Sequence, residues 1–326
     1  MRRFFYFSIL SVLLVITISC KKENSNNVVI YHALEDFRVE HMQTLLKERF
    51  PKYNITFQAM STGNLAAKLK AEGTQTEADI IVGLETSYLE GLKDFLADLS
   101  GFDLSEYLPE LLPAHKLYIP EELFSGAIMI NRTILENAKL PIPTSYQDLL
   151  IPEYKGLISM PNPKTSSTGY MFLVSLINAW GEDTAFTYFD KLSENILQFT
   201  SSGSGPVNSL IQGEIGIGLS ITYNAINAIN NRNFPMEYFF FAEGSPYNSS
   251  GSAIMKGREK RPVVKEVFDF YLTKLNKDDK ELYSPERIFK NQQNRIPNYP
   301  EHIPYANMDG IYDLTLKERL LSKWKY

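Results

Sequence analysis

The feature that most constrains the fold is an alternation of short β-rich runs with stretches of helical periodicity. Three apolar, β-branched runs open the pattern: VVIYHAL (28–34), NITFQAM (54–60) and ADIIVGL (78–84). Between the first two, residues 35–50 place Val39, Met42 and Leu46 on one helix face. Strands that alternate with helices are typical of α/β units built on largely parallel sheets. The sequence therefore predicts an α/β fold.

The remaining strand-like runs extend this pattern over a chain of 326 residues, which is long enough for two lobes rather than one core. These runs lie at 126–131, 156–162, 196–201, 215–221, 236–241 and 250–257. We interpret FSGAIMIN as a crossover into a second lobe and SPYNSSGSAIMKG as the return. This interpretation gives lobe one as 27–125 plus 252–326, and lobe two as 126–251. Ligands of such folds bind at the carboxyl ends of strands, so we expect a cleft between the lobes.

The N-terminus carries the only cysteine of the chain. Arg2 and Arg3 precede an apolar run that ends at Ser19, directly before Cys20. This layout predicts a signal peptide over 1–19, and TISC is similar to the lipidation motif of bacterial lipoproteins. We expect Cys20 to carry lipid and residues 20–26 to be the lipidated Cys and a polar tether, which places the protein outside the cytoplasm on a membrane. A plain signal peptide with an incidental Cys, or a transmembrane anchor, is the alternative.

Composition and motifs exclude several function classes. The net charge is −5 and no basic face is visible, so nucleic-acid binding is not expected. None of the four histidines has a metal-motif spacing, and neither a P-loop nor a Gly-x-Ser-x-Gly elbow is present. The sequence therefore offers little that points to an enzyme of a particular class.

Three turns rich in serine, threonine and glycine are the strongest candidate site. Each follows a predicted strand and precedes a segment that can begin a helix, where unpaired N–H groups and hydroxyls bind oxyanions. The candidate ligand-binding residues in these turns are Ser61, Thr62, Gly63, Ser166, Ser167, Thr168, Gly169, Ser202, Gly203 and Ser204. Simple helix capping is the alternative for any single turn.

Two further positions complete the candidate site. Tyr223 and Asn224 follow the run IGIGLSI at a strand-to-helix turn and are expected to point into the cleft; an ordinary surface tyrosine is the alternative. Glu35 follows the first strand, where it is either a ligand group or a favourable charge at a helix N-terminus.

The order of these motifs carries a family resemblance over nearly the whole chain after Cys20. The succession VVIYHALED, MSTGNLAAKLKAE, ADIIVGLETSYLEGL, PNPKTSSTGY, TSSGSGPVNSL and GEIGIGLSITYNA resembles that of bacterial extracellular solute-binding proteins of ABC importers, in the type-2 group that includes ferric-iron, phosphonate and hexose-phosphate binders. The resemblance implies two lobes joined by hinge strands, closing over a ligand. It also implies a monomer without catalysis of its own and without a cofactor, which delivers its cargo to an ABC permease and its ATPase.

The resemblance leaves two ligand classes open. The serine turns are similar to those that hold phosphoryl oxygens, so we expect a small oxyanion-bearing solute, a phosphorylated or phosphonate metabolite. Ferric binders use adjacent tyrosines, and here only Tyr223 of Thr222-Tyr223-Asn224 matches. The alternative is Fe(III) bound by Glu35, Tyr170 and Tyr223 with a helper anion at the serine turn.

Overall fold

The computed structural model describes residues 26–293 and 296–326; the predicted signal peptide, Cys20 and most of the tether lie outside them. The described strands are β1 (Asn27–His32), β2 (Asn54–Ala59), β3 (Ile80–Glu85), β4 (Ile119–Ile130), β5 (Ile158–Pro161), β6 (Ile196–Thr200), β7 (Ile217–Ile221), β8 (Glu237–Phe239) and β9 (Tyr247–Ile254). The described α-helices are α1 (Asp36–Arg49), α2 (Thr62–Glu72), α3 (Thr86–Gly91), α4 (Arg132–Asn137), α5 (Ser167–Trp180), α6 (Glu182–Leu192), α7 (Gly205–Gln212), α8 (Thr222–Arg232), α9 (Pro262–Phe270), α10 (Asn276–Leu282) and α11 (Leu314–Lys323). Within this part of the chain, no helix combines the length and the apolar character that crossing a membrane requires.

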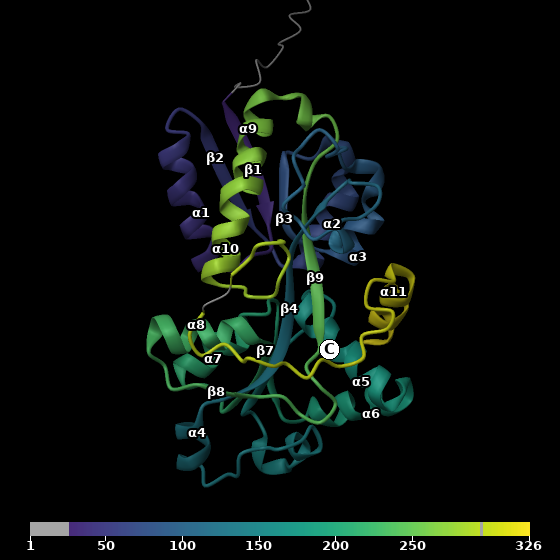
Figure 1. Cartoon of the computed structure of the whole chain (residues 1–326). Helices are drawn as coiled ribbons and strands as arrows, with labels where there is room; N and C mark the ends of the chain where they lie inside the picture. The colour runs from purple at the N-terminus through teal and green to yellow at the C-terminus, as the bar shows by residue number, and fades with distance from the viewer. Residues whose placement is uncertain (1–25, 294–295) are drawn as a thin grey trace, which may run out of the picture.

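Two strands, β4 and β9, connect the lobes (Figure 1). The strands follow the order β2-β1-β3-β9-β4-β7-β5-β6, and β8 also pairs with β4. The first half of β4 pairs with β9, and its second half pairs with β7 and β8. The change of partner falls between Ser125 and Gly126. A change of partner within one strand lets the two halves of the sheet turn relative to each other while β4 stays continuous, so β4 is the central part of the hinge.

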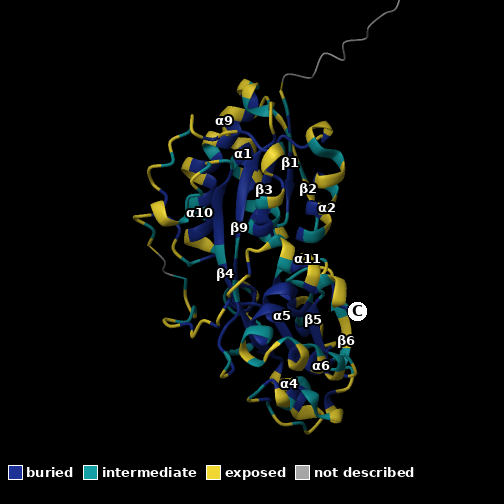
Figure 2. Cartoon of the chain, turned by 90° about the vertical axis from the view of Figure 1, so that its right-hand side faces the viewer, coloured by how far each residue is buried: buried dark blue, intermediate teal, exposed yellow. Residues whose placement is uncertain are grey.

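Each lobe is a sheet with helices on both faces, which confirms the predicted two-lobe α/β fold. In lobe one, alternate residues of β3 face opposite cores: Ile80 and Val82 pack with α1 and α9, and Ile81 packs with α2 and α3. In lobe two, β4 divides its side chains in the same way, with Ile128 toward α5 and Met129 toward α7 and α8. Figure 2 shows these strands as the buried layer and the helices exposed on their outer sides.

The first half of β4 was missed by the sequence prediction, which began this strand at residue 126. Two buried acidic residues, Glu121 and Glu122, interrupt the apolar pattern there. Acidic side chains are almost never fully buried unless they are paired, so the pattern did not indicate a strand at these residues.

The end of the chain departs from the predicted lobe boundaries, which placed all of 252–326 in lobe one. Met308, Ile311, Leu320 and Trp324 pack in the core of lobe two, together with residues of α5 and α6. The tail runs back along lobe two in Figure 1 and ends with α11 beside the junction of the lobes. The amphipathic pattern of a terminal segment shows that it buries an apolar face but does not show against which lobe, so the sequence alone placed it wrongly.

Candidate ligand-binding cleft

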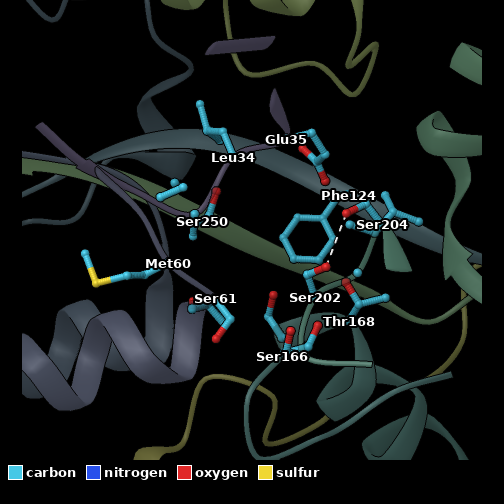
Figure 3. A pocket seen from close by; sticks show the side chains of 18 of the residues that line it. Leu34, Glu35, Met60, Ser61, Phe124, Ser166, Thr168, Ser202, Ser204 and Ser250 are labelled. Carbon is cyan, nitrogen blue, oxygen red and sulfur yellow. Dashed lines mark hydrogen bonds between the residues drawn. The ribbon is translucent and has the colours of Figure 1, made fainter. Parts of the chain in front are cut away.

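A cavity of about 370 Å³ lies between the lobes. It opens at the carboxyl ends of strands from both lobes, the position expected for a ligand in an open α/β sheet. Nine serine and threonine residues of the described chain line it: Ser61, Thr62, Ser166, Ser167, Thr168, Ser201, Ser202, Ser204 and Ser250. Figure 3 shows Ser166, Thr168 and Ser202 of lobe two in the lower part of the view and Glu35 at the top.

The hydroxyls of the three predicted turns are not used as helix caps. Ser61, Ser166 and Ser204 directly precede α2, α5 and α7, and none of these side chains accepts a capping hydrogen bond. The Ser61 hydroxyl is buried without any hydrogen-bond partner, and Ser202 and Ser204 bond only to each other, with their hydroxyl oxygens 3.2 Å apart. Because a buried hydroxyl without a partner is costly, the Ser61 hydroxyl has a hydrogen bond left to make at this cavity.

Two of the predicted glycines do not line the cavity. The Gly169 Cα lies against the end of β5, where an added Cβ would sit 2.4 Å from the carbonyl oxygen of Pro161. Gly63 lies at the lobe boundary, and its N–H donates to the carbonyl oxygen of Thr165 at 3.0 Å. These glycines allow close backbone packing, and the Gly63 contact shows that the lobes touch across the cleft. Gly203, by contrast, lines the cavity as expected.

The lobe-one side of the cavity is acidic. Glu35, Asp36 and Glu122 line it, and no lysine or arginine does so among residues 26–293 and 296–326. The side chains of Glu35 and Glu122 are 10% and 6% exposed. Burial raises the pKa of Glu35, although Arg38 opposes this effect.

Arg38 binds the carboxylates Glu35 and Glu122 of this acidic wall from the interior of lobe one. Its guanidinium is fully buried and donates to Asp279 Oδ2 at 2.6 Å, to Glu122 Oε2 at 2.7 Å and to Glu35 Oε2 at 3.3 Å. Lys280 donates to Asp279 at 2.7 Å from the same cluster. Burial alone would raise the pKa of Asp279, but Arg38 and Lys280 lower it to about 2.

Glu121 completes the cluster with a second buried acid beside Glu122. Its pKa is raised to about 7, chiefly by burial, while Lys280 opposes the rise. The cluster thus contains four carboxylates, Glu35, Glu121, Glu122 and Asp279, around two cations.

Sequence reasoning missed Arg38, Glu122 and Asp279. A signal was present for Arg38, which stands four residues before Met42 on the apolar face of α1. An arginine at such a position needs buried partners, but the sequence does not show which ones they are.

The structure separates the residues of the proposed iron site. The Tyr223 hydroxyl lies at the cavity, donates to Glu35 Oε1 at 2.8 Å and accepts from Arg38 at 3.2 Å. Tyr170 does not line the cavity: it is fully buried, and Lys317 Nζ lies 4.4 Å from its ring centre. Tyr170 points away because it is part of the lobe-two core, so the predicted set of three ligands is not assembled.

Asn224 also lies beside the main cavity rather than in it. It lines a smaller cavity that shares Glu35, Asp36 and Ser204 with the larger one. Asn224 is 4% exposed, and its Nδ2 has no hydrogen-bond partner.

The fold and the cleft define a two-lobe binding protein that encloses a small ligand between its lobes. A sequence model described as bacterial extracellular solute-binding protein matches residues 78–299, and the chain belongs to this family. The family consists of substrate-binding transport proteins rather than enzymes, and its members deliver small-molecule ligands to the permease of an ABC importer. The family resemblance inferred from the sequence is thereby confirmed.

Individual relatives differ in what they bind. An uncharacterized protein of Haemophilus influenzae is 28% identical over 249 residues, covering 71% of this chain and 69% of that protein. The periplasmic binding protein AfuA from Actinobacillus pleuropneumoniae, solved with fructose-6-phosphate bound, has a TM-score of 0.79 and 22% identity over 91% of this chain and 97% of its own. Iron-bound HitA from Pseudomonas aeruginosa has a TM-score of 0.70 and 17% identity over 91% of this chain and 98% of its own. At these identities the structures support the fold and leave the ligand open.

Proposed function

We propose that this protein captures a small oxyanion-bearing solute, a phosphorylated or phosphonate metabolite, for an ABC importer. The observation that carries the proposal is the set of hydroxyls from three turns that line one cavity without capping their helices. α2, α5 and α7 begin at the same cavity, and the positive end of a helix dipole favours anionic oxygens. Hydroxyls and N–H groups bind a phosphoryl group without a permanent countercharge.

In this proposal both lobes contribute contacts to the ligand. Ser166, Ser167 and Thr168 bind the anion, and Ser202, Gly203 and Ser204 assist from the next turn. Ser61 and Thr62 close on it from lobe one, while Tyr223 and Glu35 contact the rest of the solute. Gly63 and Gly169 act through packing, because neither lines the cavity.

Thermal unfolding with a panel of phosphorylated and phosphonate compounds tests this proposal. A ligand that binds only the folded state raises the melting temperature with concentration. We expect at least one phosphorus oxyanion to do so, with sulfate and acetate as controls for nonspecific anions. A panel in which no phosphorus compound shifts the transition contradicts the proposal.

Ferric iron is the second candidate, because Glu35 and Tyr223 put two oxygen donors 2.8 Å apart at the cavity. Burial raises the pKa of Tyr223 well above its usual range, which opposes the phenolate that iron needs. Titration with ferric citrate should give a coloured tyrosinate band if iron is the cargo. Tyr223→Phe would abolish such a band, whereas Tyr170→Phe, a matched change outside the cavity, would leave it unchanged.

We further propose that lipid on Cys20 holds this binding protein on the membrane near its permease, as a monomer. The polar residues 21–26 would act as the tether. Cys20→Ser should move the protein from the membrane fraction to the soluble fraction, and mass spectrometry of the wild-type protein should show the added acyl mass. A wild-type protein that fractionates as soluble contradicts lipid anchoring.

A further inference from the structure

The C-terminal helix α11 contacts both lobes. Leu320 and Trp324 pack it into the core of lobe two, and Arg319 pairs with Glu182 of α6 at 2.8 Å. Toward lobe one, Lys317 of the same helix forms an ion pair at the end of β3. Figure 1 shows α11 at the level where the lobes meet. The helix is therefore a further connection between the lobes, besides β4 and β9.

Lys317 is buried where the two lobes meet. Its side chain is 1% exposed, and its ammonium group donates to the carboxylate of Glu85 and, at 3.4 Å, to the Ser87 hydroxyl. The Nζ atom also lies 3.9 Å from the ring centre of Tyr88 and 4.4 Å from that of Tyr170. The first three of these residues belong to lobe one and Tyr170 belongs to lobe two, so both lobes enclose the ammonium group.

This ion pair lies next to two of the serine turns that line the cavity. The Glu85 N–H donates to Thr62 Oγ1 at 3.3 Å, and Thr62 lines the cavity from lobe one. Tyr170 is the fourth residue of α5, after Ser167 and Thr168, which line the cavity from lobe two. The ammonium group therefore contacts a residue beside each turn, one on either side of the cleft.

The cost of breaking the ion pair depends on whether the lobes are closed. When they separate, α11 should move with lobe two, because its apolar residues Leu320 and Trp324 are part of that core. Both charges then become hydrated. In the closed state a buried charge that loses its partner is strongly unfavourable, whereas a complete buried pair roughly offsets its own desolvation. Burial lowers the pKa of Lys317 and Glu85 opposes this effect, so the buried ammonium group depends on its partner.

We propose that Lys317 is a positioning residue for the ligand: its ion pair with Glu85 forms when the lobes close and stabilises the closed arrangement of the two turns. The inference adds to the proposed function a residue outside the cavity, since neither Lys317 nor Glu85 lines it. Affinity for the ligand thus depends on a helix at the far end of the chain.

Calorimetric titration of the purified full-length protein, with the phosphorus compound that most raises the wild-type melting temperature, tests the inference. Lys317→Met leaves Glu85 without its countercharge in the closed state, so we expect roughly 100- to 4,000-fold weaker binding. Adding Glu85→Gln removes the uncompensated charge and should restore the affinity to within about tenfold of the wild-type value. Lys323→Met is the matched control on the same helix: its ion pair with Glu182 stays within lobe two, so the affinity should not change.

Chemical denaturation without ligand separates this role from a merely structural one. If the pair forms only on closure, the ligand-free Lys317→Met protein should unfold at nearly the same denaturant concentration as Lys323→Met. Strong destabilisation of ligand-free Lys317→Met, wild-type affinity in this variant, or no recovery on adding Glu85→Gln would each overturn the inference. Failure of every phosphorus compound to bind would overturn the proposed function, and the ligand-free measurement would still test the role of Lys317.

Discussion

Gly63→Ala should block closure of the cleft without damaging either lobe. Gly63 is the second residue of α2, and its N–H donates to Thr165 of lobe two at 3.0 Å. A Cβ at this position would lie 2.5 Å from the carbonyl oxygen of Lys164 and 3.0 Å from the Cα of Thr165. Ordinary contact begins near 3.4 Å, so the lobes would have to separate by about 0.9 Å (3.4 − 2.5) at the closest point.

The expected loss of affinity follows from two effects on the closed state, a steric clash and a lost hydrogen bond. Overpacking against backbone costs about 1–3 kcal/mol, and the inter-lobe hydrogen bond contributes about 0.5–1.5 kcal/mol. A loss of about 2–4 kcal/mol in the closed state corresponds to roughly 30- to 1,000-fold weaker binding. The open state makes neither contact, and alanine in place of glycine favours α2 by about 0.5–1 kcal/mol, so the unliganded protein should not be destabilised.

Calorimetric titration with the phosphorus compound that most raises the melting temperature, and small-angle scattering of the free and saturated protein, measure this effect. The variant should bind weakly and should show a smaller decrease in radius of gyration on saturation. Gly101→Ala is the matched control, because nothing lies within 4 Å of its added Cβ. Wild-type affinity in Gly63→Ala would refute the reasoning, since it would mean that ligand binding does not require this approach of the lobes.

Three further predictions concern the turns, the buried cluster and the hinge. Replacing Ser202 and Ser204 together by alanine removes two hydroxyls that bond only to each other, so binding of ethylphosphonate should weaken by roughly 10- to 1,000-fold. The free energy of unfolding, measured by chemical denaturation, should stay within about 1 kcal/mol of the wild-type value. Unchanged binding would exclude this turn from the site. Arg38→Met leaves four buried carboxylates without their main countercharge, so the free energy of unfolding should fall by about 3–5 kcal/mol in the same assay. Lys68→Met, which removes a partly exposed ion pair with Glu72, should lower it much less, and similar losses for the two variants would contradict the assigned role of the cluster. Glu286 accepts a hydrogen bond from the Ser125 hydroxyl on β4, and burial raises its pKa from 4.5 to about 7. The folded state therefore binds this proton more tightly than the unfolded state does, so the free energy of unfolding falls as the pH rises from 4.5 to 7. Since the side chain is only partly buried, the fall should be about 1–3 kcal/mol, and Glu286→Gln should remove it when unfolding is compared at pH 4 and pH 8; an identical pH dependence in the two proteins would show that Glu286 is not its source.

The sequence by itself determined the α/β class and the positions of most strands, because these depend on local periodicity. The runs at 28–34, 54–60 and 78–84 each overlap one strand of lobe one. It also located the serine turns, since a hydroxyl-rich segment between a strand and a helix is a local signal. The family resemblance followed from the order of the same segments.

Only the tertiary structure decided which of these turns meet and what charge they face. Tyr170 and Tyr223 both follow strands, yet Tyr170 packs in the core of lobe two and Tyr223 reaches the cavity. Arg38 and Asp279 are 241 residues apart, and no local pattern indicates that they pair. Likewise, the end of the chain is amphipathic whichever lobe it covers. Local patterns indicate which residues are buried, but the partners of a buried group are set by long-range packing. The acidic wall of the cleft could therefore be recognised only in the folded structure of lobe one.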